Sequence, residues 1–310
     1  MIPKVSVILS VYKPNLIDFE RTIDSIVSQD FKDFELIVVK DDQEQSTLKA
    51  LQSIHNVITN TSIIDNIKNI GLVKSLNKAL KKAKGVYIAR IDVGDWWHPQ
   101  KLEAQYDAMV EDDLVLTGTQ VKLFSTELDI LKDQSMPLSD LEIRSCLENG
   151  KNPFVHSSVM FKKIHNVFYN ENALYTEDFE LWCRYYFFGS MSNLSQFYTN
   201  YIVDLNSITG NKRYLMFTNA TTVYVNFIRY LYRKDKVSLI LKGFIASPLK
   251  NMSFSERIFS KYYSMAYYEM LKGSRQRYLA FIILSFVCKP KVVYLFFKRK
   301  AIKLWYSYNL

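Results

Sequence analysis

Several carboxylates of this 310-residue sequence follow predicted β-strands or open a predicted helix. They are Asp41, Asp92, Asp95, Glu177 and Asp178. If they gather at one edge of a sheet, they repel one another unless a cation or hydrogen-bond donors offset their charge. Mg²⁺ or Mn²⁺, held by one or two carboxylates and by substrate phosphates, is the simplest chemistry for such a site.

Strand and helix signals alternate along the first 110 residues. Apolar, β-rich runs predict strands at 5–11, 34–39, 60–64 and 86–92. Apolar residues at helical spacing predict helices over 18–29, capped by Asp18, and over 73–83, closed by Gly85. This α/β alternation predicts a mostly parallel sheet that is covered on both faces. Ligands of such sheets bind outside the carboxyl ends of the strands, where the carboxylates lie.

The remaining sequence suggests two regions. Up to about residue 205 the pattern is mixed, with short strands in LVLTGT, SSVMF and YIVDL and helices near 139–148 and 177–188. After about residue 212 it becomes helical, basic and rich in aromatic residues. We therefore predict a catalytic domain over 1–211 and a C-terminal helical region over 212–310.

Five collinear stretches between residues 3 and 210 resemble the inverting glycosyltransferases of family 2, which have the nucleotide-sugar-binding GT-A fold. The stretches are VSVILSVYKP, SIVSQDFKDFELIVVKDD, NIGLVKSLNKALKKAKGVYIARIDVGDWWHPQKLEAQ, NPFVHSSVMF and YTEDFELWCR. Each is a weak signal alone. Their common order over two-thirds of the chain makes the resemblance specific.

The resemblance implies a role for each matched position. Asp178 would be the general base, with Glu177 beside it, and His156 would lie near the acceptor. A divalent ion would bridge the donor diphosphate to the Asp-x-Asp motif at Asp92. The implied donor-binding residues are Val11, Tyr12, Asp41, Arg90 and Asp92, and the implied metal ligands are Asp92, Asp95 and Asp204.

Three positions depart from the family's pattern. Gly94 stands where the motif has its second aspartate, so Asp95 would have to take over the metal contact. Lys40 replaces an acid that is common before Asp41. Near 201–209 an Arg-x-His pair is often found, and Asp204 occupies the histidine position here. An aspartate oxygen is an acceptable ligand for a hard cation, so this exchange is chemically tolerable.

Two aromatic features have both a functional and a structural interpretation. Trp96 and Trp97 could form a wall on which an acceptor sugar stacks, although aromatic side chains are more often part of a core. His156 could contact the acceptor or could be a hydrogen-bonded structural histidine. The lysines of KKAKG (81–85) are interpreted as a solvated helix face.

Charge is unevenly distributed along the chain. The composition, 48% hydrophobic and 23% charged, argues against a disordered chain, and three separated cysteines argue against a zinc or redox motif. The net charge of +9 divides into +16 for residues 212–310 and −7 for the remainder. Basic and aromatic residues in 276–305 suit a helix at an anionic membrane surface. Nucleic acid is the weaker interpretation, because no nucleic-acid-binding signature is present.

No apolar run is long enough to span a bilayer, and the start of the chain is interpreted as a first strand rather than a signal peptide. We therefore expect a metal-dependent inverting transferase on the cytoplasmic face of the membrane. It would move a hexose or N-acetylhexosamine from a UDP-sugar to a glycan or lipid-linked acceptor of a capsule or O-antigen. The alternative is a non-catalytic relative that binds nucleotide sugar as a scaffold. A Rossmann dehydrogenase is disfavoured, because no GxGxxG follows the first strand.

Overall fold

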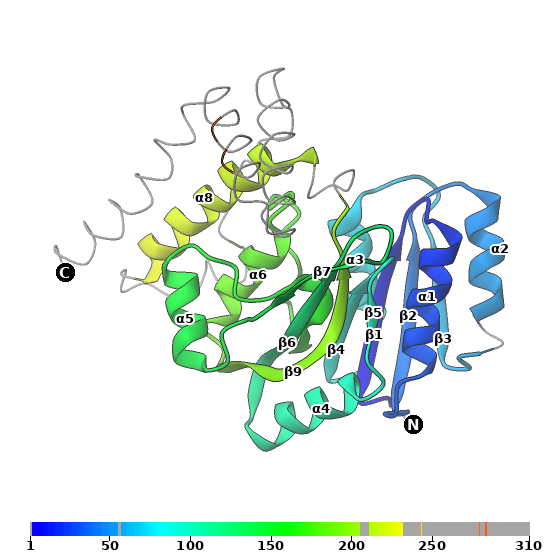
Figure 1. The fold of residues 1–310 in the computed structure, drawn as a ribbon, viewed down its shortest axis with the longest axis horizontal. Helices are drawn as coiled ribbons and strands as arrows, with labels where there is room; N and C mark the ends of the chain where they lie inside the picture. Colours follow the sequence, from blue (N-terminus) through cyan, green and yellow to red (C-terminus); the bar gives the residue numbers. More distant parts are fainter. Residues whose placement is uncertain are drawn as a thin grey trace.

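The computed structural model describes residues 2–54, 57–204 and 211–231, with the single residues Gly243, Leu279 and Ile283. Within these residues, nine strands form one sheet that has helices on both faces (Figure 1). The strands are β1 (Val5–Val11), β2 (Phe34–Lys40), β3 (Thr61–Asp65), β4 (Tyr87–Asp92), β5 (Trp96–Trp97), β6 (Leu114–Phe124), β7 (Ile130–Gln134), β8 (Met160–Lys162) and β9 (Ser190–Ile202). The helices are α1 (Leu16–Val27), α2 (Gln45–Ile54), α3 (Leu72–Lys82), α4 (Lys101–Glu111), α5 (Asp140–Glu148), the 3₁₀ helix η1 (His156–Ser158), α6 (Glu177–Tyr185) and α8 (Arg213–Leu231).

Four parallel strands form the first half of the sheet, in the order β3-β2-β1-β4. Val5 of β1 lies opposite Phe34 on β2 and Tyr87 on β4, so these strands run in step. Strand β8 is antiparallel to both β4 and β6, and β9 is parallel to β6. The four parallel strands therefore share one carboxyl edge, which ends at Val11, Lys40, Asp65 and Asp92.

Alternation along the strands divides the apolar core into two layers. Ile8, Ile37 and Ile88 pack on the face that is covered by α3, α5, α6 and α8. Val7, Leu36 and Ala89 pack on the other face, against α1, α2 and α4. The strands are apolar on both sides because both sides are buried, as the continuous apolar runs predict.

The ends of two helices differ from the prediction. Asn15, not Asp18, caps α1: its Oδ1 accepts hydrogen bonds from the amides of Ile17, at 2.9 Å, and Asp18. Asp18 lies in the first turn and pairs with Arg21. Helix α3 ends at Lys82, and its C-cap is Ala83 rather than a left-handed glycine. Gly85 is required for close approach instead, since a Cβ there would lie 2.6 Å from the amide nitrogen of Ser6.

Two predicted short strands also differ in extent from the observed strands. Only Met160 and Phe161 of the SSVMF stretch belong to a strand, β8, and the serines belong to η1. The strand signal at YIVDL is the end of the longer β9, which stops at Ile202.

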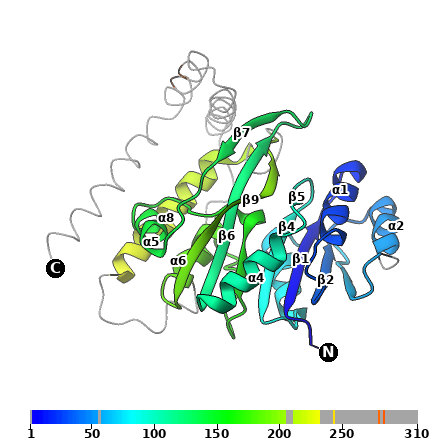
Figure 2. The same cartoon turned by 60° about the horizontal axis from the view of Figure 1, so that its bottom comes forward.

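The first helix beyond residue 211 is continuous with the core of the preceding domain. Val223, Tyr224 and Phe227 of α8 are buried in the same cluster as Trp182 of α6. Figure 2 shows α8 beside α5 and α6, at the end of the sheet away from α1 and α2. The boundary at 211 stays a prediction, but the structure shows that α8 packs on the apolar core of the preceding residues.

In the described parts of the chain, no helix is both long and apolar enough to cross a membrane. The basic, aromatic stretch at 276–305 lies outside the described residues except for Leu279 and Ile283.

Candidate active site

Strand β4 and helix α6 bring two pairs of charged residues together. Ile88 of β4 packs in the layer that contains α6, so Arg90 and Asp92, two and four residues further on, lie on the same face of the strand. Helix α6 begins with Glu177 and Asp178. The charge on Asp92 acts on Glu177, and the charge on Arg90 acts on both carboxylates of α6. The two predicted acidic groups therefore face one centre.

Arg90 is the cation of this centre, and its side chain is only 1% exposed. It forms an ion pair with Asp92 and a hydrogen bond of 3.4 Å from Nη1 to Ser157 Oγ. Burial alone would lower the pKa of Arg90, but the surrounding negative groups, Asp92 above all, raise it. A buried guanidinium that stays charged holds Asp92 in place and offsets the negative charge of its neighbours.

Asp95 lies deeper than Asp92. It is 3% exposed, and its Oδ1 accepts a hydrogen bond of 3.0 Å from the amide of Ile202 on β9. Its Oδ2 is buried and has no hydrogen-bond partner among the described residues. Burial and the nearby charge of Asp92 raise the pKa of Asp95 to about 8.

These features test whether a divalent cation fits. The unpartnered buried oxygen of Asp95 and the carboxylate of Asp92 are a suitable pair of hard ligands. The side chain of Asp92 is 40% exposed. Among the described residues, no three His, Cys, Asp or Glu side chains are grouped to hold a metal, so Asp204 does not complete a three-ligand site with Asp92 and Asp95 here. Asp92 and Asp95 would supply two oxygen ligands to such a cation.

The backbone conformation explains why glycine occupies position 94. Gly94 has a φ of +102°, in the left-handed region where an aspartate would be strained. The turn is fixed by Thr22 of α1, whose hydroxyl accepts from the Gly94 amide at 3.0 Å and donates to the Asp95 carbonyl at 2.8 Å. This turn directs Asp95, rather than residue 94, toward Ser157 and Asp92.

Glu177 and Asp178 are held differently. Asp178 accepts hydrogen bonds of 2.7 Å from the Asn152 amide group and from the Phe179 backbone N–H, yet burial raises its pKa above the ordinary value. Burial and the charge of Asp178 raise the pKa of Glu177 to about 7. The pair can therefore exchange a proton near neutral pH, which is the property required of a general base.

The predicted nucleotide-binding residues lie at the carboxyl ends of β1 and β2. Val11 is buried, whereas Tyr12 is 53% exposed with the Lys13 ammonium 5.9 Å from its ring centroid. Asp41 is 2% exposed and accepts from the amides of Ile70 and Gly71, both at 2.8 Å. In this structure Asp41 joins β2 to the start of α3, and of these three residues Tyr12 presents the accessible surface.

The two tryptophans of β5 have different roles. Trp97 is 2% exposed, donates from Nε1 to the Ser157 carbonyl at 2.8 Å and lies under the buried Lys101 ammonium, 3.9 Å from the ring centroid. The prediction that Trp97 could contact an acceptor sugar is therefore wrong, because its ring belongs to the core. Trp96 is partly exposed, 4.7 Å from the Phe124 ring by centroids, and stays a candidate for sugar stacking.

His156 combines the two interpretations that the sequence allowed. Its Nε2 is 2.8 Å from the Tyr169 hydroxyl, and burial, together with the positive charge of Arg90, keeps its pKa well below the ordinary value. The imidazole is therefore neutral at physiological pH. It is partly exposed, so contact with an acceptor stays a prediction.

Three residues that support this site lie outside the predicted set. Ser157 joins Arg90 to Asp92, Asn152 holds Asp178, and Tyr169 holds His156. Ser157 and Asn152 both lie within the NPFVHSSVMF stretch (152–161), which is the signal that the sequence offers for them.

Two known glycosyltransferases are similar in sequence to this chain. The chain is 31% identical over 185 residues to the O-antigen biosynthesis glycosyltransferase WbnJ of Escherichia coli, covering 58% of this chain and 70% of WbnJ. It is also 31% identical over 185 residues to the amylovoran biosynthesis glycosyltransferase AmsE of Erwinia amylovora, covering 58% and 68%.

Solved structures show the same fold. The S. aureus TarS 1–349 structure in complex with UDP superposes with a TM-score of 0.56 at 18% identity, covering 99% of this chain and 92% of TarS 1–349. This confirms the predicted GT-A type of α/β fold. The sequence model described as Glycosyl transferase family 2 matches residues 6–168, more than half of the chain. The predicted resemblance is thus confirmed, and the chain belongs to glycosyl transferase family 2.

Proposed function

We propose that this chain is an inverting, metal-dependent hexosyltransferase that uses a nucleotide-diphosphate sugar, with UDP-sugar as the first choice. The acceptor is a glycan or a lipid-linked glycan in the synthesis of a surface polysaccharide. This choice is supported by WbnJ, a glycosyltransferase of O-antigen biosynthesis, by AmsE, a glycosyltransferase of amylovoran biosynthesis, and by TarS, solved with UDP and with UDP-GlcNAc. A mannosyltransferase of the same fold, from Pyrobaculum calidifontis, has been solved with GDP-Man and Mn²⁺.

One observation supports the proposal: the positive charge of the buried Arg90, which forms an ion pair with Asp92 of β4, also acts on Glu177 and Asp178 of α6. Asp92 and Asp95 would hold Mn²⁺ or Mg²⁺, which stabilises the charge that develops on the leaving diphosphate. Asp178, oriented by Asn152, takes the proton of the attacking acceptor hydroxyl. Attack from the face opposite the leaving group inverts the anomeric carbon.

The test is a thermal-shift screen of nucleotide sugars with and without Mn²⁺, followed by a transfer assay with the best donor. A ligand that binds only the folded state raises the melting temperature. We expect a UDP-sugar to give the largest rise, and only with Mn²⁺ present. A chain that binds donor but neither hydrolyses nor transfers it would instead be the non-catalytic scaffold that the Gly94 substitution suggests.

Attachment to the cytoplasmic face of the membrane through residues 212–310 is part of the same proposal. It rests on the net charge of +16 in that region. It is tested by loss of anionic vesicle binding when the chain is cut after residue 275.

A further inference from the structure

A second basic region lies within the catalytic domain, along helix α3. Between Asn66 and Lys84 the chain has six lysines and no acidic residue. A solvated helix face normally mixes both signs of charge, because like charges at neighbouring positions repel. The lysines are Lys68, Lys74, Lys78, Lys81, Lys82 and Lys84.

The helical spacing gathers most of these lysines on one exposed face. Lys74, Lys78, Lys81 and Lys82 are spaced by three or four residues and are exposed, while Leu76 and Leu80 point into the core. Lys84 continues the face past the end of the helix and is followed by Val86, which is 54% exposed. We call this surface, Lys74 to Val86, the α3 lysine face.

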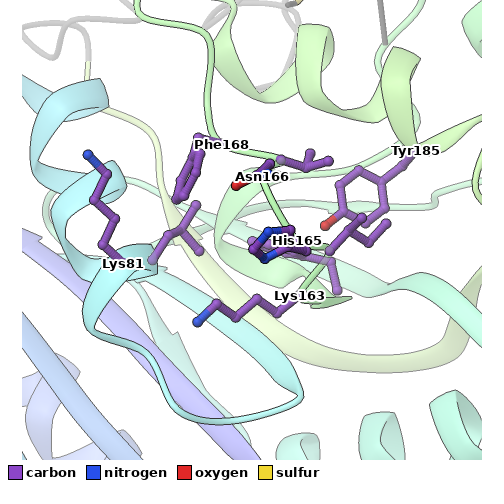
Figure 3. Close-up of a pocket in the computed structure, with 10 residues that line it drawn as sticks. Lys81, Lys163, His165, Asn166, Phe168 and Tyr185 are labelled. Carbon is purple, nitrogen blue, oxygen red and sulfur yellow. The ribbon is translucent and has the colours of Figure 1, made fainter. Parts of the chain in front are cut away.

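A small cavity opens at the end of the α3 lysine face (Figure 3). Its volume is about 190 Å³, and Leu80, Phe161, Val167 and Tyr185 supply much of its lining. Lys81 and Lys163 also line it, from α3 and from the segment that follows β8. The ammonium of Lys81 is 5.6 Å from the Phe168 ring centroid. Cationic groups around an apolar hollow suit a ligand that carries both a negative charge and an apolar part.

The position of this face relates it to the active site. Helix α3 begins at the carboxyl edge of the sheet, where the Gly71 amide donates to Asp41. It ends at the opposite edge, where the Lys84 amide donates to Glu35 at the start of β2. A flat anionic surface lying along α3 would therefore reach the edge that holds the catalytic carboxylates.

We propose that the α3 lysine face docks on a bilayer containing anionic phospholipids. The lysines contact lipid phosphates, and the cavity beside Lys81 admits an apolar part of a lipid. Charge complementarity calls for an anionic partner, and the apolar cavity with the exposed Val86 favours an amphiphile over a soluble polyanion. This surface is separate from residues 212–310, and its test does not depend on which sugar is transferred.

The experiment compares two quadruple variants of the full chain, each of which removes four positive charges. Both use exposed lysines, and glutamine preserves helix propensity. Lys78 is left intact because it bonds to Asn66 beside Asp41. The face variant carries Lys74→Gln, Lys81→Gln, Lys82→Gln and Lys84→Gln, and the control carries Lys32→Gln, Lys49→Gln, Lys132→Gln and Lys151→Gln.

Sedimentation with phosphatidylcholine vesicles, with and without phosphatidylglycerol, gives the partition coefficient of each protein. We expect the face variant to bind anionic vesicles at least about tenfold more weakly than the wild type, and the control to stay within about twofold of the wild type. The reason is that only basic residues close to the membrane surface contribute to binding. Equal melting temperatures and donor-induced thermal shifts show that both variants fold.

Three results would overturn the proposal. The first is a partition coefficient of the face variant equal to that of the wild type, which would assign vesicle binding to another region. The second is an equal loss of vesicle binding in both variants, which would make net charge the cause. The third is binding of soluble polyphosphate to the wild type through the same lysines without binding of anionic vesicles, which would make the partner a polyanion.

Discussion

At the scale of single residues, the candidate site depends on the protonation state of Glu177, which its neighbours influence. Burial and the adjacent Asp178 raise its pKa to about 7, so near neutral pH the Glu177–Asp178 pair gains or loses a proton. A general base works only when it is ionised. The pair, together with Arg90, therefore sets the pH range in which transfer can occur.

The pH dependence of kcat/KM tests this directly. Protonation of the pair below neutral pH removes the base, so we expect the rate to fall as the pH drops below about 7 and to level off above it. Glu177→Gln removes the group whose pKa is raised to about 7, so the midpoint should move to lower pH. A profile that is flat between about pH 5 and 8 would contradict this assignment.

Ser157 gives a second prediction at this scale. Its hydroxyl joins the Asp92 amide, at 3.2 Å, to Arg90, so Ser157→Ala should leave the fold intact but loosen Asp92, a proposed metal ligand. We expect the Mn²⁺ concentration for half-maximal activity to rise by about tenfold, as for other supporting residues of metal sites. Ser158→Ala is the matched control, since its hydroxyl bonds to the Val155 carbonyl instead. Equal Mn²⁺ dependence in both variants would count against the role of Ser157.

At the scale of elements, the central strands depend on a close approach at the end of α3. A Cβ on Gly85 would lie 2.6 Å from Ser6 N and 2.7 Å from the Val5 carbonyl carbon, both of which are backbone atoms of β1. We expect Gly85→Ala to lower the free energy of unfolding by about 1–3 kcal/mol, because rigid backbone must move. Urea denaturation measures this, with the exposed Lys84→Ala as control, and an unchanged midpoint would refute it.

Sequence patterns predicted the helices and strands more completely than they predicted the contacts between these elements. The runs at 5–11 and 34–39 are apolar throughout because both faces of those strands are buried, and this is visible locally. The difference between Trp96 and Trp97 is not local: it depends on pairing of β5 with β9, where Trp97 lies opposite Thr199. The link from Ser157 to Asp92 likewise joins residues 65 positions apart, and no local pattern reports it.

At the scale of the whole molecule, helix α8 joins the region after 211 to the catalytic core. Phe227 is fully buried and lies near Tyr186, with ring centroids 5.3 Å apart, and Phe187, at 6.0 Å. A chain that ended at 211 would expose this part of the core. The sequence showed the change in charge at this point but not the packing that continues across it.

Phe227→Ala tests this packing. Deletion of a fully buried aromatic ring costs about 3–5 kcal/mol, so we expect a lower free energy of unfolding for the whole catalytic domain in one cooperative transition. Arg229→Ala, on the exposed side of α8, should change it by less than about 0.5 kcal/mol. A separate early transition, with the main transition unchanged, would show that α8 is independent of the catalytic domain.

The central claim is that Asp92 binds the donor through its metal while Asp178 acts on the acceptor in the same centre. The most direct measurement is donor affinity and transfer rate for Asp92→Asn and Asp178→Asn, each assayed with Mn²⁺ and a UDP-sugar. We predict that Asp92→Asn loses Mn²⁺-dependent donor binding. Asp178→Asn should bind donor normally and transfer sugar about 10²–10⁴-fold more slowly. Wild-type transfer rates in Asp178→Asn, or unchanged Mn²⁺-dependent binding in Asp92→Asn, would contradict the account.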